Sequence, residues 1–330
     1  MKIIVRMPNW LGDLVMALPA VRGLQQNFAT GGPRGWGGEP PEIVLALRKP
    51  FADLFPKERL CVLDGSETAA LRREGADRIV LMTNSFSTAL AAYRAGISER
   101  IGYSLHGRRL LLTWPLDWKA RPHHQRDQYR QLARAGGAAG TPETARLNPK
   151  DFPRMAGLEK TEKRRRRIVL APGARYGAAK RWGGFGELAR ELVQSGWEVH
   201  VVGGKNEAPR TAEGDFQDWT GRTSLTELAG ILASADLVVG NDSGIVHLAA
   251  AFGRPVVTLF GPTDESRTAA DGAVVVRASG VDCAPCHLRV CPIDHRCMKR
   301  ISVEHVMRAI EKTVSVAGDS ETVSEGKKGE

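Results

Sequence analysis

The chain has 330 residues, of which 42% are hydrophobic and 25% charged, a composition typical of a folded globular protein rather than a disordered or fibrous one. This length predicts two domains of roughly 150 residues each. A formal net charge of +10 favours anionic partners, among them nucleic acid, a membrane surface and phosphorylated substrates.

Targeting and membrane-spanning segments are not visible in the sequence. The apolar run at residues 3–5 ends at Arg6 and is too short for the core of a signal peptide. No stretch reaches the roughly 20 apolar residues that a spanning helix needs. We therefore expect a cytoplasmic protein whose contact with a membrane, if it has one, is peripheral on the inner face of the cytoplasmic membrane.

The first half alternates between strand and helix patterns. KIIV at residues 2–5 predicts a buried strand, and the polar turn NWLGD follows at 9–13. Apolar residues at helical spacing from Leu14 to Leu24 predict a helix, in which Pro19 removes a hydrogen bond or causes a bend. Further strand candidates lie at 42–47, 60–64 and 78–82, with helix candidates at 69–73 and 85–95. This alternation predicts a parallel α/β sheet.

The second half repeats the alternation after a charged, proline-containing stretch at 141–167. Strands are predicted at 167–171, 197–202, 236–240 and 255–260, with helices at 184–196, 225–235 and 245–253. We predict two Rossmann-like domains at 1–160 and 161–315 with a cleft between them, and a disordered tail at 316–330. The basic run KTEKRRRR at 160–167 fits either a solvated linker or a contact with an anionic membrane.

A turn with phosphate-binding chemistry lies between a strand and a helix in the second half. In NDSG at 241–244, backbone N–H groups stand at the positive end of the helix that follows, where anions bind. Ser243 adds a hydroxyl donor, and His247 lies in the first helical turn. The alternative is structural: Asp242 or Ser243 only caps the helix and His247 is buried.

Three more candidates follow strands. The loop APGARYGAAKRW at 171–182 contains glycines that permit a close approach to a ligand, and Lys180 could neutralise phosphate charge. Its spacing is not that of a P-loop, and a surface turn is the alternative. Glu207 follows the strand at 197–202, where an acidic residue often binds ribose, although it could equally stabilise a helix N-terminus. Asp13 follows the first strand and could be a general base or a helix cap.

Three segments together resemble the heptosyltransferases of glycosyltransferase family nine. They are NWLGDLVMALPAVRGLQ at 9–25, APGARYGAAKRW at 171–182 and GNDSGIVHLAAAFGRPVVTLFGPT at 240–263. The middle segment is more similar to type II than to type I members. The resemblance implies a GT-B fold with two parallel sheets facing a central cleft, the N-terminal domain binding the acceptor and the C-terminal domain the nucleotide sugar. It also implies inverting, metal-independent transfer of L-glycero-D-manno-heptose from ADP-heptose to the heptose of the lipopolysaccharide inner core.

The resemblance also implies roles for single residues. Asp13 matches the general base, and Lys180 matches a lysine that contacts the donor phosphate. Glu207 matches the ribose-binding residue, and Asp242 would bind sugar hydroxyls. The residues that match the diphosphate-binding part of the family's donor loop are Ser243, Gly244 and His247. The implied partners are ADP-heptose and a Kdo–lipid A core acceptor at the inner membrane surface, and no cofactor is required for catalysis.

Residues 283–297, CAPCHLRVCPIDHRC, form a segment that we call the Cys-rich segment. It contains Cys283, Cys286, Cys291 and Cys297 with two histidines, a composition that suits a structural zinc ion or iron–sulfur cluster. The spacing is not that of a standard zinc ribbon. Reduced thiols packing an irregular loop, or redox-active disulfides, are the alternatives.

Several other functions compete with the type II assignment. They are a type I heptosyltransferase, a GT-B transferase for another sugar and a GT-B sugar-nucleotide epimerase. A nucleic-acid-binding protein would fit the charge, but no helix-turn-helix, RRM or zinc-finger pattern is present and the basic residues are not interleaved with aromatic ones. A phosphorylated lipid acceptor accounts for the charge, so we expect no nucleic-acid partner.

Overall fold

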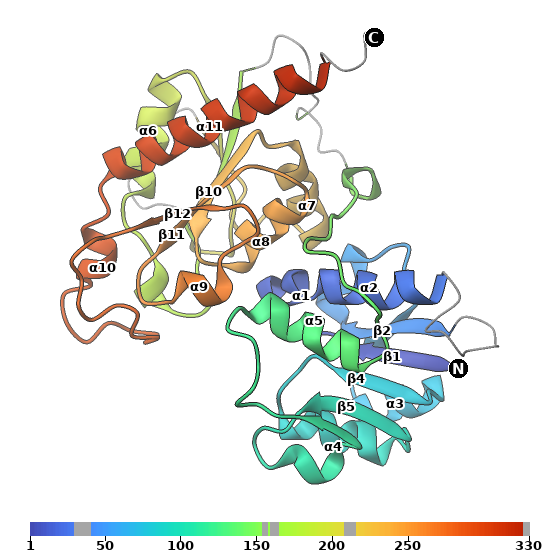
Figure 1. The fold of residues 1–330 in the computed structure, drawn as a ribbon. Coiled ribbons are helices and arrows are strands. Elements are labelled where there is room, and N and C mark those ends of the chain that lie inside the picture. The colour runs from blue at the N-terminus through green and yellow to red at the C-terminus, as the bar shows by residue number, and fades with distance from the viewer. Residues whose placement is uncertain (30–40, 154–157, 159–164, 208–215, 326–330) are drawn as a thin grey trace. The chain divides into compact units, whose positions relative to one another are not determined.

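The computed structural model describes residues 1–29, 41–153, 158, 165–207 and 216–325. The chain divides into two compact units, Met1–Arg146 (unit 1) and Leu147–Glu330 (unit 2). Each unit contains one six-stranded sheet in which all neighbouring strands are parallel, with helices on both faces (Figure 1). The predicted α/β class with two Rossmann-like sheets is therefore confirmed.

The sheet of unit 1 has the strand order β3-β2-β1-β4-β5-β6. Its strands are β1 (Lys2–Arg6), β2 (Glu42–Arg48), β3 (Leu60–Leu63), β4 (Arg78–Leu81), β5 (Glu99–Tyr103) and β6 (Trp114–Leu116). The central strands are apolar almost throughout, because helices cover both faces of a parallel sheet. Pro115 lies in the edge strand β6, where a missing N–H costs no hydrogen bond of the ladder.

Helices α1 (Leu11–Met16), α2 (Leu18–Ala29) and α5 (Gln125–Ala135) cover one face of this sheet, and α3 (Glu67–Glu74) and α4 (Phe86–Arg94) cover the other (Figure 1). The helix predicted from Leu14 to Leu24 is in fact two helices, which meet at Ala17. Pro19 is the second residue of α2, where its missing N–H would have no partner within the helix anyway. Short 3-10 helices follow β2 (Lys49–Leu54) and β5 (Arg108–Leu111, called η2).

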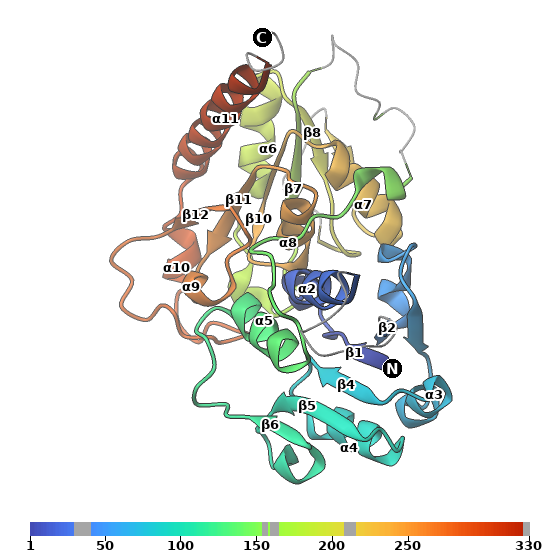
Figure 2. The ribbon, with the colours of Figure 1, turned by 45° about the vertical axis from the view of Figure 1, so that its right-hand side comes forward.

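The sheet of unit 2 has the order β12-β11-β10-β7-β8-β9. Its strands are β7 (Arg167–Ala171), β8 (Glu198–Val201), β9 (Gln217–Asp218), β10 (Leu237–Asn241), β11 (Val256–Phe260) and β12 (Val274–Arg277). Helices α6 (Phe185–Gln194) and α11 (Val303–Glu325) cover one face, and α7 (Leu225–Ser234) and α8 (Gly244–Ala251) cover the other (Figure 2). Shorter helical segments are η3 (Pro149–Asp151), η4 (Ala178–Lys180), α9 (Glu265–Thr268) and α10 (Arg296–Lys299).

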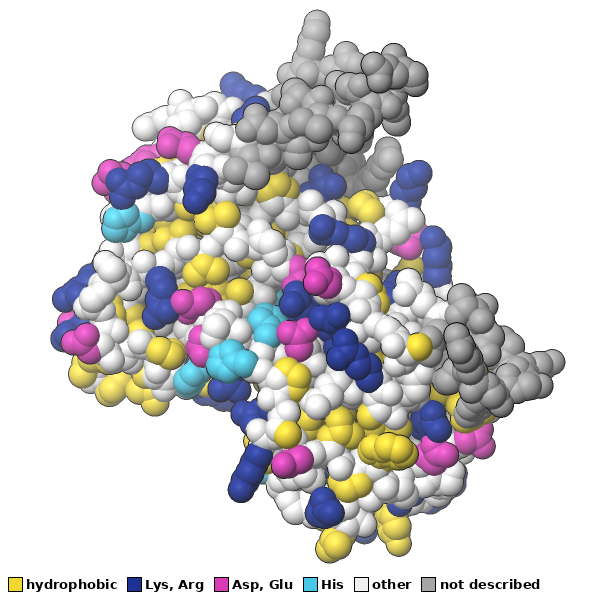
Figure 3. All heavy atoms as spheres, viewed as in Figure 1, with side chains coloured by type: hydrophobic (Ala, Val, Ile, Leu, Met, Phe, Trp, Pro, Cys, Tyr) yellow, Lys and Arg dark blue, Asp and Glu magenta, His cyan; other side chains and the backbone are white. Residues whose placement is uncertain are grey.

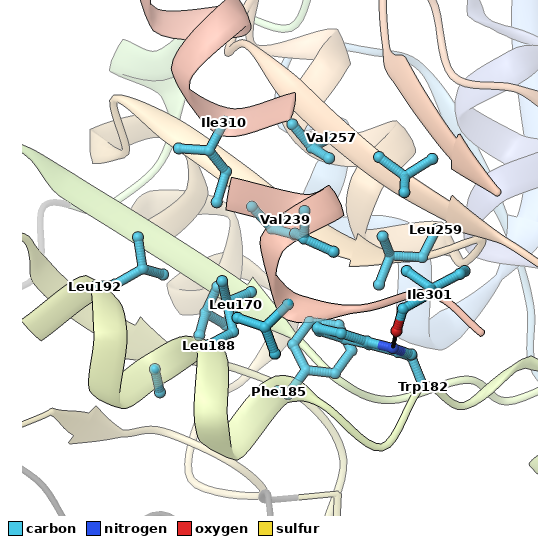
Figure 4. Packing of buried hydrophobic residues seen from close by; sticks show 14 of the residues in the cluster. Leu170, Trp182, Phe185, Leu188, Leu192, Val239, Val257, Leu259, Ile301 and Ile310 are labelled. Carbon is cyan, nitrogen blue, oxygen red and sulfur yellow. Dashed lines mark hydrogen bonds between the residues drawn. The ribbon is translucent and has the colours of Figure 1, made fainter. Parts of the chain in front are cut away.

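The core of unit 2 lies between its sheet and the pair α6 and α11 (Figure 4). Phe185 and Leu188 from α6 meet Leu170 and Val239 from the central strands, and all four side chains are almost fully buried. Each such side chain contributes about 1.5–3 kcal/mol relative to an exposed one. The buried indole of Trp182 donates to the carbonyl of Ile301 over 2.8 Å, which fixes the end of the loop after β7 against this core. Figure 4 shows part of this core and labels ten of its residues.

Both sheets place their first strand at the centre, and the direction of chain progression reverses beside it. The reversal lies between β1 and β4 in unit 1 and between β7 and β10 in unit 2. In such sheets ligands bind beyond the carboxyl ends of the strands at the point of reversal. The loops that follow these four strands are therefore where a site is expected.

Two sequence predictions concern the ends of unit 2. Residues 160–164 of the basic run lie outside the described residues, whereas Arg167 begins β7, is 1% exposed and pairs with Glu198 over 3.0 Å. Helix α11 continues to Glu325 and so includes residues 316–325 of the segment predicted to be a disordered tail. Among the described helices, none combines the length and the apolar character needed to cross a membrane.

Candidate functional site

The N-terminus of α8 forms the centre of the site in unit 2. Strand β10 ends at Asn241, and Ser243 holds the N-cap position with extended backbone. Within the described parts of the chain, no side chain caps this helix, and the buried Ser243 hydroxyl has no hydrogen-bond partner. The first N–H groups of a helix have no partner inside it and carry the positive end of its dipole. This end of α8 is therefore suited to bind an anion.

Asp242 and Lys180 pair beside this helix terminus. The Lys180 ammonium donates to the Asp242 carboxylate over 2.5 Å and to the Asp242 carbonyl over 3.2 Å. The side chains are 12% and 6% exposed, so each charge depends on the other for compensation. The Thr263 hydroxyl, at the carboxyl end of β11, donates to the same carboxylate over 2.8 Å. Lys180 thus adds a fixed positive charge next to the α8 terminus.

Glu207 lies against the start of the loop after β7. Its carboxylate accepts from the Gly204 N–H over 2.7 Å and from Arg181 over 3.1 Å. A Cβ on Gly173 would lie 2.0 Å from a Glu207 carboxylate oxygen, so only glycine leaves room for this carboxylate. The loop after β7 consequently contacts Glu207 near its beginning, at Gly173, and contacts Asp242 near its end, through the Lys180 side chain.

His247 lies in the first turn of α8 and is 5% exposed. Asn241, which sequence reasoning left without a role, is fully buried at the end of β10. It donates to the Pro172 carbonyl over 2.7 Å and accepts from the Trp182 N–H over 3.2 Å. Asn241 therefore ties both ends of the loop after β7 to the strand that leads into the α8 terminus.

Asp13 lies in the first turn of α1, directly after β1 in unit 1. The Gln125 amide donates to its carboxylate over 3.0 Å and to the Tyr129 hydroxyl over 2.8 Å. Burial, and then the charge of Asp13, raises the pKa of the Tyr129 hydroxyl well above its ordinary value. The carboxylate is thus oriented by a neutral amide beside a hydroxyl that stays protonated.

Sequence reasoning did not find Gln125, Tyr129 or Thr263. The first two lie on α5, more than a hundred positions from Asp13, and no local pattern connects them to it. Thr263 ends the segment LFGPT, whose strand β11 borders β10. Its place just after the carboxyl end of a neighbouring strand is the sequence feature that could have identified Thr263 as a site residue.

The Cys-rich segment does not bear out a structural metal site. Among the described residues, no three His, Cys, Asp or Glu side chains are placed to hold a metal ion, and all four cysteines of the segment are free thiols. Cys297 is buried near Gly261, whereas Cys283 and Cys286 are exposed. Free thiols agree with the alternative of a loop packed by reduced thiols. Burial, and then the neighbouring thiolate charges, raises the pKa of Cys297.

Comparisons with known proteins identify what the chain is similar to. A family model described as glycosyltransferase family 9 (heptosyltransferase) matches residues 67–296. Lipopolysaccharide heptosyltransferase 2 of Escherichia coli (strain K12) is 29% identical over 311 residues, which cover 81% of this chain and 85% of that protein. Lipooligosaccharide heptosyltransferase 2 of Campylobacter jejuni (serotype O:6) is 25% identical and covers 94% and 99% of the two chains. The solved structure of E. coli ADP-heptose lipopolysaccharide heptosyltransferase II superposes with a TM-score of 0.72 at 24% identity, covering 96% of this chain and 100% of that one.

Proposed function

Because the chain belongs to glycosyltransferase family 9 (heptosyltransferase) and is therefore a glycosyltransferase, we propose that it is a type II heptosyltransferase. It transfers L-glycero-D-manno-heptose from ADP-heptose to the heptose of the lipopolysaccharide inner core. The observation that carries the proposal is the uncapped terminus of α8, with its unpartnered Ser243 hydroxyl and the Lys180 charge beside it. A diphosphate is the donor group that fits this arrangement.

The other donor contacts follow from the same loops. Ser243 and the N–H groups from Gly244 onward would bind the diphosphate, with His247 in the same helical turn. Glu207 has a carboxylate oriented by Gly204 and Arg181, which suits ribose hydroxyls. Asp242, oriented by Lys180, would accept from hydroxyls of the sugar.

The mechanism is a single displacement with inversion. The Asp13 carboxylate takes the proton of the acceptor hydroxyl while its oxygen forms a bond to the anomeric carbon of the donor. The bond from that carbon to the ADP oxygen breaks, and negative charge accumulates on the departing diphosphate. The α8 terminus and Lys180 stabilise this charge, a contribution of fixed dipoles and charges. We propose that these groups suffice without a divalent metal ion.

Unit 1 has features that suit an anionic, membrane-embedded acceptor. Trp10 is 53% exposed three residues before Asp13 and offers a flat apolar face to a sugar ring. Leu110 in η2 is 92% exposed and Trp114 in β6 is 62% exposed. Residues 86–126 contain seven Lys or Arg against two acidic residues. Figure 3 shows hydrophobic side chains beside Lys and Arg at the end of unit 1 that carries α4. We propose that this end contacts the anionic inner face of the cytoplasmic membrane.

The test is release of ADP from ADP-heptose in the presence of EDTA. Wild type is compared with Asp13→Asn and with the control Asp53→Asn, which changes an exposed carboxylate of the same unit. We expect release that requires Kdo–lipid A bearing one heptose, and a kcat about 100- to 10,000-fold lower for Asp13→Asn with an unchanged Kd for ADP. Asp53→Asn should behave as wild type.

Other outcomes separate the competing functions. Release only with Kdo–lipid A that lacks heptose would indicate a type I enzyme. Conversion of ADP-heptose without any acceptor would indicate an epimerase or a hydrolase. Activity abolished by EDTA and restored by a divalent ion would refute the metal-independent mechanism.

A further inference from the structure

The Cys-rich segment lies directly against the loop that carries Lys180. The carbonyl of Arg289 accepts from the Ala179 N–H over 3.0 Å, and the His295 side chain donates from Nε2 to the Ala179 carbonyl over 2.6 Å. Both polar backbone groups of Ala179 are thus bound by this segment. Ala179 is 3% exposed and immediately precedes Lys180, so these two bonds fix the backbone from which the Lys180 side chain extends.

Further contacts join the segment to the same loop. The Tyr176 hydroxyl donates to the His287 carbonyl over 2.7 Å. A Cβ on Gly177 would lie 2.3 Å from the Arg289 carbonyl oxygen, so the two backbones touch at a glycine. The Tyr176 ring has two cations near it, the Lys180 ammonium at 5.0 Å and the Arg289 guanidinium at 5.2 Å from its centroid.

The segment itself is anchored to the body of unit 2. The His287 N–H donates to the Pro262 carbonyl over 2.7 Å, and Cys297 and Met298 are buried in the core. His287 and His295 both have left-handed backbone, with φ of 55° and 60°. This conformation is unfavourable for a residue other than glycine and persists only where surrounding contacts impose it. The segment is therefore held in place by the Lys180 loop and by the core, although much of its own surface is exposed.

We propose that the Cys-rich segment is a positioning element for the donor diphosphate. His295 holds Ala179 and thereby sets the position of Lys180, and Arg289 adds a second positive charge beside the Lys180 loop for the same diphosphate. The proposal rests on the proposed function, because it takes the donor to be a nucleoside diphosphate sugar. It assigns a role to residues that neither the sequence motifs nor the mechanism above used.

The test measures the Kd of ADP by calorimetry together with kcat and both KM values. The variants are His295→Ala, His295→Gln, Arg289→Ala and the control Ile293→Ser, which changes a 59% exposed residue of the same segment. We expect His295→Ala to raise the Kd of ADP and the KM of the donor about 5- to 10-fold, since one hydrogen bond is lost. The KM of the acceptor should stay constant. His295→Gln, whose amide can donate to the same carbonyl, should recover most of the loss.

Arg289→Ala should weaken ADP about 3- to 10-fold and reduce the dependence of binding on salt, because one cation is lost near the diphosphate. Ile293→Ser should match wild type. Wild-type affinity for ADP in folded His295→Ala and Arg289→Ala would overturn the positioning role while leaving the proposed function intact. Failure of His295→Gln to recover would also contradict the hydrogen-bond explanation. Absence of ADP binding by wild type would instead refute the proposed donor, and the positioning role with it.

Discussion

Replacement of Gly173 by alanine isolates the role of Glu207 without touching a charged group. The new methyl carbon would lie 2.0 Å from one Glu207 carboxylate oxygen and 2.5 Å from the carboxyl carbon, far inside contact distance. The carboxylate must move, and it then loses its hydrogen bond from Gly204. Strand β7 ends at Ala171, so its buried ladder is not disturbed.

The size of the effect follows from the contact that the donor would lose. A hydrogen bond between a ribose hydroxyl and a charged carboxylate contributes about 1.5–3 kcal/mol, which corresponds to about 10- to 150-fold in affinity for ADP. The ion pair with Arg181 contributes little to this figure, because Arg181 is 46% exposed and screened by solvent. The kcat at saturating donor should change much less than the KM of the donor.

Calorimetry with ADP would measure the effect in Gly173→Ala, with Gly183→Ala as the matched control, since a Cβ on Gly183 would meet nothing within 4 Å. In the double variant Gly173→Ala with Glu207→Ala, affinity should be no lower than in Glu207→Ala alone. Additive losses would show that Gly173 acts through another contact. Unchanged affinity in Gly173→Ala would refute the role of Glu207 in donor binding.

Three further results are expected. Lys180→Ala leaves the buried Asp242 carboxylate unpaired and should lower the free energy of unfolding in urea by about 3 kcal/mol, most of which Asp242→Asn restores. Burial lowers the pKa of His200 below its ordinary 6.5, so the unfolded chain binds more protons and the free energy of unfolding should fall as pH drops through 6.5, a fall that His200→Gln reduces. Leu110→Ser with Trp114→Ala should weaken binding to anionic vesicles about tenfold.

Each of these results has a control or a contradicting outcome. Val290→Ser, which replaces a 71% exposed apolar side chain of unit 2 by a polar one, should leave vesicle binding unchanged. Equal binding to anionic and zwitterionic vesicles would contradict the proposed charge dependence. A flat pH profile of wild type between pH 5 and 8 would contradict the argument from His200, and wild-type stability of Lys180→Ala would contradict the argument that Asp242 depends on Lys180 for charge compensation.

The fold was predictable because local signals agreed with the tertiary structure. Apolar runs such as RIVLA at 167–171 are buried on both faces of a parallel sheet, and their composition shows it. Four strands were not predicted. The edge strands β6 and β9 have three and two residues, too few for a periodic pattern, and the edge strand β12 has four. Strand β5 lies inside its sheet but begins with the charged residues Glu99 and Arg100, which weaken the apolar signal. The family resemblance and the glycosyltransferase class were also predictable, since their motifs are contiguous segments, and both are confirmed.

The residues that hold the site residues in position were not predictable in the same way. Candidate residues such as Asp13 and Asp242 can be recognised in the sequence, because each follows the end of a predicted strand within one contiguous segment. Gln125 and His295 act across 112 and 116 positions, respectively, through single hydrogen bonds to Asp13 and Ala179. No composition or spacing marks such a bond. The metal prediction for the Cys-rich segment is not supported, because no three ligand side chains among the described residues are placed to hold a metal ion.

The two units show how one strand order can carry different chemistry. Both have the central strand followed by a loop at the point of reversal, but the loops differ in length and charge. After β1, the chain enters α1 at Leu11 and presents the Asp13 carboxylate in its first turn. After β7, the chain runs through Gly173 and Gly177 before α6 begins at Phe185, and this longer loop places Lys180 beside a second helix terminus. The proposed base therefore needs only a short loop and one helical turn, whereas the proposed diphosphate site uses a longer loop that is held by contacts from outside it. In the proposed positioning role, the Cys-rich segment supplies these contacts in unit 2, so substitutions in it should change donor affinity and leave the KM of the acceptor unchanged.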